Sequence, residues 1–383
     1  MHFLMRARPV RDALVAFLLS RAILFLLLVV GSQTAFVGKV YNDRIWETRI
    51  VLESARVVPG IILTVMNGDT WWYRSIAVGG YERRPFSPQP VANWAFFPLY
   101  PLTVRALHVS GDYAIDGMLV SNAALLGALW LLAQLTLAAG GTEEDAARAT
   151  FFLAFFPTSY FLSWPLPESL FLLVTVAAFY AAMRDRWWMA GAFGALAAAT
   201  RAAGIFLLPA LLLLAIERGV LRRAWAWLLV IPAGTAAFML HLYRVTGNAL
   251  AFAGVQGSWG HHPTPFWTPL VAYLRNPNVI GEPWNLIGMN ALAALLLFGT
   301  AVWWLVRRRW AFGTYALLSV LFPLSAGSLQ SMTRYAAVVF PLFIALAFAG
   351  RRPAVERAIA AISMVLFGWL VALATLRLDF ALA

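Results

Sequence analysis

The sequence contains no cysteine and little charge. Charged residues make up 12% of its 383 residues and hydrophobic residues 62%, whereas roughly a quarter of a soluble domain is charged. The absence of cysteine excludes a disulfide framework and any metal site with cysteine ligands. The chain also lacks a glycine-rich phosphate loop, a His-Glu-x-x-His motif and a Ser-His-Asp pattern, which argues against a nucleotide-driven enzyme. Without an internal repeat or a soluble domain of ordinary size, residues 1–383 are expected to form one membrane domain.

Long runs of apolar residues make up most of the sequence. A spanning helix needs about 17–25 apolar residues, and the chain offers about 11 candidates, several of them short or interrupted by Pro or Gly. We therefore expect an all-α polytopic membrane protein, with transmembrane helices at residues 12–37, 114–138, 148–163, 168–183, 187–200, 203–217, 224–244, 285–306, 310–327, 334–349 and 354–375. The first run is too long for a cleavable signal peptide, so we expect a retained helix. The segment Phe96–Ser110 is short and contains Pro98 and Pro101, so we expect an interfacial or partly inserted helix.

The net charge of +12 comes from arginines in short loops between the apolar runs, at residues 6–11, 184–186, 218–223, 307–309 and 351–357. Cytoplasmic loops of membrane proteins are enriched in Lys and Arg, so this pattern predicts a cytoplasmic N-terminus and no nucleic-acid partner. The long loops 38–112 and 245–284 would then lie outside the cytoplasm, as in a multi-pass inner-membrane protein. The same topology brings four residues to or near that outer face: Asp69, Glu168, Arg201 and Arg334.

Asp69 is the most informative of these residues, because it follows the first apolar run and is ringed by aromatics in Asn67–Tyr73. A carboxylate in an aromatic-lined cleft can act as a general base, and we predict this catalytic role for Asp69. Trp71, Trp72 and Tyr73 are predicted to bind substrate by stacking on a sugar ring. The alternative is that Asp69 is a helix N-cap, since aspartate before a Trp-Trp-Tyr helix start has good capping chemistry.

Glu168, Arg201 and Arg334 are also expensive to place in a membrane protein. Glu168 begins an apolar segment after two prolines; it is either a functional acid or a first-turn acid favoured by the helix dipole. Arg201 and Arg334 are predicted to bind phosphate, because a guanidinium can bind it through two donors. The alternatives are an ion pair with Glu168 or Asp69, or snorkelling. We expect Arg21, within the first apolar run, to snorkel.

Two further patterns carry weaker signals. Phe96–Pro101 contains two prolines three residues apart, which fix a bent entry into an apolar helix and are expected to shape the floor of a cleft. His261 and His262 are a weak indication of a metal site, because adjacent side chains seldom face one ion. We therefore predict no required metal ion or other cofactor.

Five blocks, taken in order over residues 12–350, resemble the PIG-V family of membrane mannosyltransferases, including its bacterial members. Asp69–Tyr81 is similar to the family's Trp-Asp-Ser-x-x-Tyr-x-x-Ile-Ala-x-x-Gly-Tyr block, and Ala95–Pro101 to its Phe-Phe-Pro-Leu-x-Pro element. Phe155–Phe171 is similar to its Ser-Pro and Tyr-Ser-Glu-Ser-Leu-Phe element, Thr200–Gly204 to Thr-Arg-x-x-Gly, and Met332–Tyr335 to Met-Pro-Arg-Tyr. One departure is Gly68, where the family usually has tryptophan.

The resemblance implies a GT-C fold, in which the first outer loop lies along the membrane as juxtamembrane helices. It implies an inverting glycosyltransferase that moves a sugar, expected to be mannose, from a polyprenyl-phosphate donor to a hydroxyl of a glycan, lipid or protein acceptor outside the cytoplasm. Asp69 would be the base and Glu168 a second acid or a sugar ligand. Arg334 and Arg201 would bind the donor phosphate, and Tyr335 would join the substrate-binding aromatics.

Two other functions fit the same composition. A flippase or transporter of lipid-linked glycans would place its charges near the midplane of discontinuous helices, often in repeated halves. A non-catalytic membrane subunit of a glycan-assembly complex would need no catalytic carboxylate. The gathering of charge at one face and the absence of a repeat favour the transferase.

Overall fold

The computed structural model describes residues 2–35, 59–277 and 286–375. The remaining internal segments, 36–58 and 278–285, include parts of the two predicted outer loops, which therefore lie partly outside the described residues. Every regular element in the described part is an α-helix or a 3-10 helix. The all-α class predicted from the apolar composition is confirmed.

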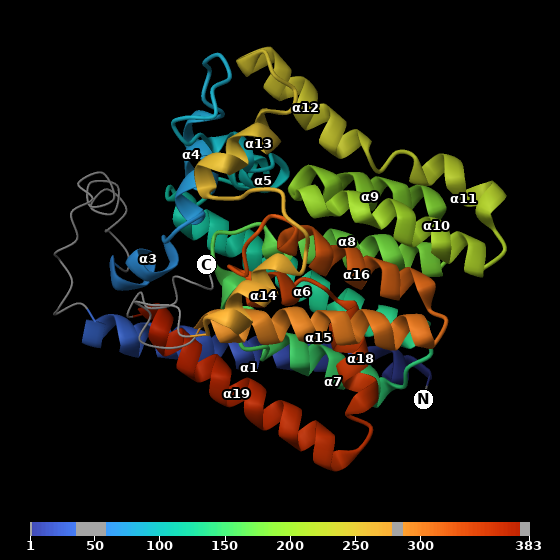
Figure 1. Cartoon of the computed structure of the whole chain (residues 1–383). Coiled ribbons are helices and arrows are strands. Elements are labelled where there is room, and N and C mark those ends of the chain that lie inside the picture. The colour runs from blue at the N-terminus through green and yellow to red at the C-terminus, as the bar shows by residue number, and fades with distance from the viewer. Residues whose placement is uncertain (1, 36–58, 278–285, 376–383) are drawn as a thin grey trace.

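Long apolar helices lying side by side form the body of the molecule (Figure 1). They are α1 (His2–Ala35), α6 (Tyr113–Ala138), α8 (Glu168–Met183), α9 (Trp187–Thr200), α10 (Leu207–Glu217), α15 (Leu286–Val306), α16 (Trp310–Leu324) and α19 (Pro353–Thr375). Helix α8 packs between α6 and α9, α15 packs on α16, and α1 lies against α6 and α19. The core of the bundle is built from Ala, Leu and Phe side chains of these helices.

Small residues let α9 approach its neighbours, α11 (Leu221–Leu228) and α12 (Ala233–Thr246), closely. A Cβ atom on Gly191 would lie 2.1 Å from the carbonyl oxygen of Trp227, and one on Gly234 would lie 1.9 Å from that of Ala195. Neither position can therefore hold a larger residue without moving a backbone. Close packing at small residues is a main source of attraction between helices in lipid, where the hydrophobic effect is weak.

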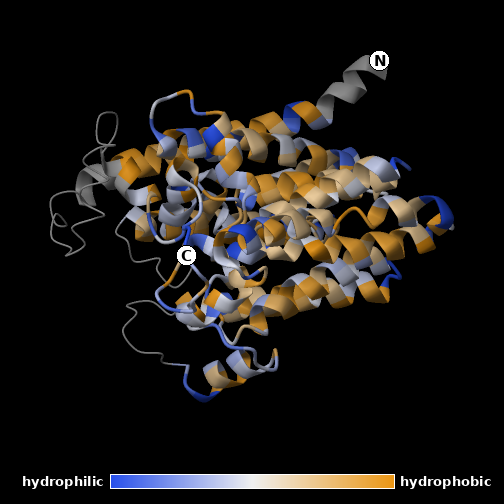
Figure 2. Cartoon of the chain, turned by 90° about the horizontal axis from the view of Figure 1, so that it is seen from above, coloured by the Kyte–Doolittle hydropathy of each residue, from blue (hydrophilic) through white to orange (hydrophobic). Residues whose placement is uncertain are grey.

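Five helical segments of the described residues are long and apolar enough to cross a membrane: Pro9–Val30 within α1, Tyr113–Ala138, Leu221–Thr246, Leu286–Val306 and Pro353–Thr375. The third of these segments consists of α11 and α12 with the turn between them. Three shorter apolar helices accompany them: Glu168–Met183, Ala202–Glu217 and Trp310–Leu324. Figure 2 shows hydrophobic residues along the bodies of the helices and hydrophilic residues concentrated in the turns at their ends. The chain is thus a multi-pass membrane protein, and the larger number of about 11 spans stays a prediction.

Four predicted spans are not single helices, and the expectation of one helix at each is wrong. Residues 203–217 form the 3-10 helix η4 (Ala202–Phe206) and α10, and residues 224–244 lie in α11 and α12. The other two spans are broken at a proline. Residues 148–163 form α7 (Glu143–Ala154) and the 3-10 helix η3 (Ser159–Ser163), and residues 334–349 form α17 (Met332–Ala336) and α18 (Pro341–Ala349). Proline has no amide hydrogen to continue a helix, and Pro157 and Pro341 lie at the two breaks. Irregular backbone at membrane depth is tolerated only where protein covers it or a cavity is lined, so both breaks are sites of structural interest.

Short elements cover one end of the bundle, which we call the site end. They are α3 (Pro59–Val65), α4 (Thr70–Gly79), η2 (Asn93–Ala95), α5 (Leu99–Ala106), α13 (Ala251–Gly254) and η5 (Val255–Trp259). Helix α5 has eight residues, which is about 12 Å and too short for a span. The Tyr100 hydroxyl donates to the Gly117 carbonyl at 2.9 Å, and the Ser121 hydroxyl donates to the Leu166 carbonyl at 3.1 Å. These bonds join α5, α6 and the segment before α8.

The arginine-rich turns lie together at the opposite end, which we call the basic end; they are residues 184–186, 217–223, 307–309 and 351–352 (Figure 1). Arg218 Nη2 donates to Asp185 Oδ2 at 2.7 Å, and the Ala311 amide donates to Glu217 Oε1 at 3.0 Å. These bonds hold three of the turns together. The described chain is completed by η4 (Ala202–Phe206) and α14 (Thr268–Arg275).

A second ion-pair network ties α7 to the turn before α19 at the basic end. Thr142 and Asp145 form a capping box at the start of α7. Arg351 Nη2 donates to Asp145 Oδ2 at 2.7 Å, and Arg148 Nη1 donates to Asp145 Oδ1 at 3.2 Å. Burial alone would raise the pKa of Asp145, but hydrogen bonds from Arg351 and Thr142 outweigh it and hold the pKa below its usual range.

Candidate active site

Four charged side chains that are far apart in sequence form one connected cluster at the site end. Arg334 donates from Nη1 to Asp69 Oδ2 at 2.8 Å and from Nε to Glu168 Oε1 at 2.6 Å. Arg201 donates from Nη1 to the same oxygen of Glu168. Two carboxylates and two guanidiniums balance in charge, which is the condition under which ionised groups are tolerated away from water.

Each member of the cluster stands at a helix end or break. Asp69 directly precedes α4, Glu168 opens α8, Arg201 separates α9 from η4, and Arg334 lies in the short helix α17. Helix ends expose backbone groups that have no partner within the helix. Asp69 directly follows Gly68, and Glu168 directly follows Pro167. The four charged side chains therefore meet where helices begin, end or break.

Asp69 occupies the position before α4 but its side chain does not cap the helix. Its backbone is helical, at φ −59° and ψ −23°, and its carboxylate makes no capping hydrogen bond. The Thr70 hydroxyl donates to the Asn67 carbonyl at 2.9 Å within this turn. The Asp69 side chain is 35% exposed, and the one bond it makes to the described residues is through Oδ2 to Arg334. The N-cap alternative is wrong, and Oδ1 is left open to the surroundings.

Glu168 is fully buried, and its two oxygens differ. Oε1 accepts from both Arg201 and Arg334, whereas Oε2 is buried without a hydrogen-bond partner. A buried unpaired carboxylate oxygen is costly, and such a group in a native structure calls for an explanation. A ligand hydroxyl or a water molecule at Oε2 would supply one. The ion-pair alternative for both arginines is what the structure contains, and their phosphate-binding role stays a prediction.

The turn that carries Arg334 is held by residues that sequence reasoning missed. The amide and hydroxyl of Thr333 both donate to Asn290 Oδ1 at 3.0 Å, and the Thr158 hydroxyl donates to the Thr333 carbonyl at 2.9 Å. Ser331, just before α17, adopts a left-handed backbone with φ 63°. A signal for Asn290 was available, because a polar amide in an apolar span such as residues 285–306 is expensive unless bonded.

Arg21 does not snorkel, and that prediction is wrong. It is 3% exposed and donates from Nη2 to the Ala154 carbonyl at 2.8 Å and from Nη1 to the Ser159 carbonyl and the Ser163 hydroxyl, both at 2.9 Å. The break between α7 and η3 leaves carbonyls without helical partners, and the guanidinium satisfies them. Arg21 therefore fixes the segment that leads to Glu168.

The predicted substrate-binding aromatics separate into buried and partly exposed side chains. Trp71 and Tyr73 are buried, and burial raises the pKa of Tyr73, so its phenol stays neutral. Trp72 is partly exposed and stacks on Phe96 with ring centres 5.8 Å apart. Tyr335 is also partly exposed, and the Arg201 guanidinium lies 5.2 Å from the centre of its ring. Trp72 and Tyr335 are therefore the aromatics best placed to meet a ligand.

A segment of the second predicted outer loop, residues 255–262, packs against Trp72 and Phe96. The Trp259 ring meets Trp72 edge-on with centres 5.3 Å apart, and its indole nitrogen is buried without a partner. His261 Nδ1 lies 2.9 Å from Gln256 Oε1. Burial lowers the pKa of His261, while the Asp69 carboxylate acts in the opposite direction. Sequence reasoning did not connect this loop with Asp69.

His261 and His262 are the weak metal-site candidates of the sequence. Within residues 2–35, 59–277 and 286–375, no three His, Asp or Glu side chains are grouped so that they could share a metal ion.

Comparison with known proteins gives a distant structural likeness. No protein-family model and no curated protein matches the chain, so the PIG-V resemblance stays a prediction. The structure is similar to the oligosaccharyltransferase of Archaeoglobus fulgidus tethered with an acceptor peptide, at 16% identity and TM-score 0.43 over 89% of this chain and 55% of that one.

The same enzyme in complex with zinc and sulfate matches at 14% identity and TM-score 0.43, over 94% of this chain and 52% of that one. The archaeal oligosaccharyltransferase AglB in complex with an inhibitory peptide and a dolichol-phosphate matches at 13% identity and TM-score 0.41, over 89% and 55%. The chain thus spans about half the length of these structures. Because all three TM-scores lie below 0.5, nothing about this chain's activity or substrates follows from them.

Proposed function

We propose that this chain is an inverting glycosyltransferase of GT-C type, similar to the PIG-V family, with about 11 membrane spans. It transfers a sugar, with mannose the first candidate, from a polyprenyl-phosphate donor to an acceptor hydroxyl at the extracytoplasmic face. The observation that carries the proposal is the bridge made by Arg334, which joins Asp69 to buried Glu168 across 265 and 166 residues of sequence. Charges held at such a cost inside a membrane protein are functional candidates by default.

The proposed reaction is a single displacement. Asp69 accepts the proton of the acceptor hydroxyl as that oxygen attacks the anomeric carbon. The bond between the anomeric carbon and the phosphate oxygen breaks on the opposite face, and polyprenyl phosphate leaves with the electron pair. The sugar is thereby transferred with inversion, and the proton ends on the Asp69 carboxylate before passing to solvent.

The arginines stabilise the leaving phosphate in this scheme. Arg201 donates from Nη1 to Glu168 and makes no further hydrogen bond within the described residues. Its remaining N–H groups can therefore donate to phosphate oxygens. A fixed guanidinium in a site that excludes water stabilises developing negative charge more strongly than it would in water. No metal ion is needed for that step.

Glu168 has a separate role as a ligand of the sugar. Its unpaired Oε2 can accept a hydrogen bond from a donor or acceptor hydroxyl. Trp72 and Tyr335, which are partly exposed beside the cluster, offer ring faces to the apolar side of a sugar ring. The polyprenyl chain stays in the bilayer alongside the helices.

The experiment is sugar transfer by the purified protein from synthetic polyprenyl-phosphate mannose to a panel of acceptors. Asp69→Asn keeps the shape of the side chain and removes the base, so turnover should fall by about 10³-fold. The matched control is Glu82→Gln, which changes an exposed carboxylate paired with Arg84 in the same region and should leave turnover unchanged.

Undiminished turnover in Asp69→Asn would exclude Asp69 as the base. A wild-type protein that moves the lipid donor across vesicles without cleaving it would instead be a transporter. A purified protein inactive with every acceptor, but active on addition of a partner, would be a non-catalytic subunit.

A further inference from the structure

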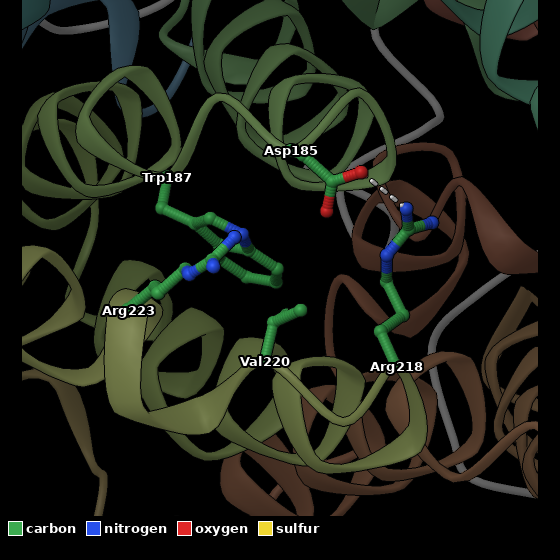
Figure 3. A pocket seen from close by; sticks show the side chains of 5 residues that line it. All are labelled: Asp185, Trp187, Arg218, Val220 and Arg223. Carbon is green, nitrogen blue, oxygen red and sulfur yellow. Dashed lines mark hydrogen bonds and ion pairs between the residues drawn. The ribbon is translucent and has the colours of Figure 1, made fainter.

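The basic end contains a pocket that the proposed reaction does not use (Figure 3). It has a volume of about 460 Å³ and is lined by Asp185, Trp187, Arg218, Val220 and Arg223. Figure 3 shows the Arg218 and Arg223 side chains on opposite sides of it, with the Arg218 guanidinium turned towards Asp185. The pocket lies between the turn that follows α8 and the turn that follows α10.

The charge of this pocket suits a single anion. Asp185 is paired with Arg218 at 2.7 Å, which leaves the Arg223 guanidinium in excess. Arg223 is exposed, and its side chain makes no hydrogen bond to the described part of the chain. Two guanidiniums facing one space bind a phosphodiester well, because each can donate two hydrogen bonds to its oxygens.

An apolar groove lies next to the pocket and shares its turn. The groove also has a volume of about 460 Å³, and its lining is Leu212, Leu221, Arg222, Trp225 and Leu229. Residues 220–223 are shared between the two spaces: Val220 and Arg223 line the first, and Leu221 and Arg222 line the second. A charged space and an apolar space that meet at one turn match the head group and the acyl chain of a lipid.

Helix α11 has the character of an interfacial segment. It places two arginines beside Trp225 and Trp227, which are 50% and 52% exposed. Tryptophan is enriched where a membrane meets water, and basic clusters at such a depth attract anionic lipids. A bilayer lipid is therefore the source of the phosphodiester that this position favours.

We infer that the pocket and the groove together bind one anionic phospholipid. Its phosphodiester lies between Arg218 and Arg223, and an acyl chain lies along Trp225 and Leu229. The bound lipid fastens α10 and α11 to the turn that carries Asp185. This site is independent of the sugar-transfer proposal, because none of its residues belongs to the charged cluster at the site end.

The test measures lipid retention by native mass spectrometry and melting temperature in detergent, with added phosphatidylglycerol, phosphatidylcholine or inorganic phosphate. Wild-type protein should bind phosphatidylglycerol in preference to phosphatidylcholine. The double variant R218Q/R223Q should bind phosphatidylglycerol about 25-fold more weakly, since each arginine near anionic lipid contributes about a fivefold factor. The control R307Q/R308Q removes the same charge from another turn of this end and should retain the lipid.

Each other outcome overturns the inference. An equal loss of phosphatidylglycerol binding in both double variants would mean that the whole basic end attracts the lipid. Equal retention of phosphatidylglycerol and phosphatidylcholine would mean that the site does not select for negative charge. Protection by inorganic phosphate alone would make the pocket a site for a free anion. Should R218Q/R223Q fail to fold, the single variant R223Q answers the question, because the Arg223 side chain makes no hydrogen bond or ion pair with the residues that the structure describes.

Discussion

The two ends of this molecule hold arginine in different ways. At the site end, Arg334 is 4% exposed and Glu168 is fully buried, and each depends on the other. At the basic end, the Arg218–Asp185 pair is 30% and 56% exposed. When one partner of an exposed ion pair is removed, water solvates the charge that remains. When one partner of a buried pair is removed, water cannot reach the remaining charge. Equal substitutions at the two ends should therefore have unequal effects on stability.

Glu168→Gln should give the largest effect. It removes the negative charge that balances Arg201 and Arg334 and should lower the free energy of unfolding by about 3–5 kcal/mol, as expected when one partner of a buried ion pair is removed. Unfolding in mixed detergent micelles measures this change. The double variant Glu168→Gln/Arg201→Gln should recover part of the loss, because one of the two stranded cations is gone. A decrease in unfolding free energy below about 1 kcal/mol in the single variant, as for an exposed pair, would show that the buried pair is not the more important for stability.

Asp145→Asn should give an intermediate effect with a pH dependence. Asp145 is buried but its partner Arg351 is half exposed, so the loss should be about 2 kcal/mol at pH 7, typical of hydrogen bonds to a charged group. The lowered pKa of Asp145 in the folded state means that its contribution is present above the unfolded value of about 3.9 and is lost as the pH falls through the folded pKa.

The measurement is the difference in unfolding free energy between wild type and Asp145→Asn across pH. It should stay constant above about pH 5 and shrink below about pH 4. A difference that is unchanged at lower pH would show that the carboxylate charge does not provide the stability.

Asp185→Asn should give the smallest effect. The pair with Arg218 is exposed, so its loss should cost less than about 1 kcal/mol and should vanish in high salt. Asparagine tolerates the left-handed backbone of this position, φ 57°, as aspartate does. The freed Arg218 should bind phosphatidylglycerol more tightly in the native mass spectrometry assay. Weaker binding in this variant would contradict the proposed placement of the phosphodiester.

The sequence was most informative about single helices and about which residues carry charge. The predicted spans 168–183 and 187–200 agree with α8 and α9 to the residue, because turns rich in arginine bound both helices at the basic end and prolines or Arg201 bound them at the other. The gathering of Asp69, Glu168, Arg201 and Arg334 near one end could also be inferred, since it follows from counting spans and arginines.

The sequence allowed ion pairs of Arg201 and Arg334 with Glu168 or Asp69 as an alternative, but it could not determine which residues pair. Nothing in local spacing couples Asp69 to Arg334, which are 265 residues apart, because that contact depends on how helix breaks pack against each other. Arg21 was misjudged for the same reason: the carbonyls that hold it are exposed by the break after Ala154, and a continuous span through residues 148–163 would have offered none.

Arg21 also constrains how the protein is made. It enters the membrane with the first helix, but the Ser159 groups that bind it are synthesised 138 residues later. A lone arginine at the middle of a newly inserted helix costs about 2.5–3.5 kcal/mol by translocon measurements. This cost is relieved only when the segment after α7 has been synthesised and its carbonyl and hydroxyl groups accept hydrogen bonds from the guanidinium.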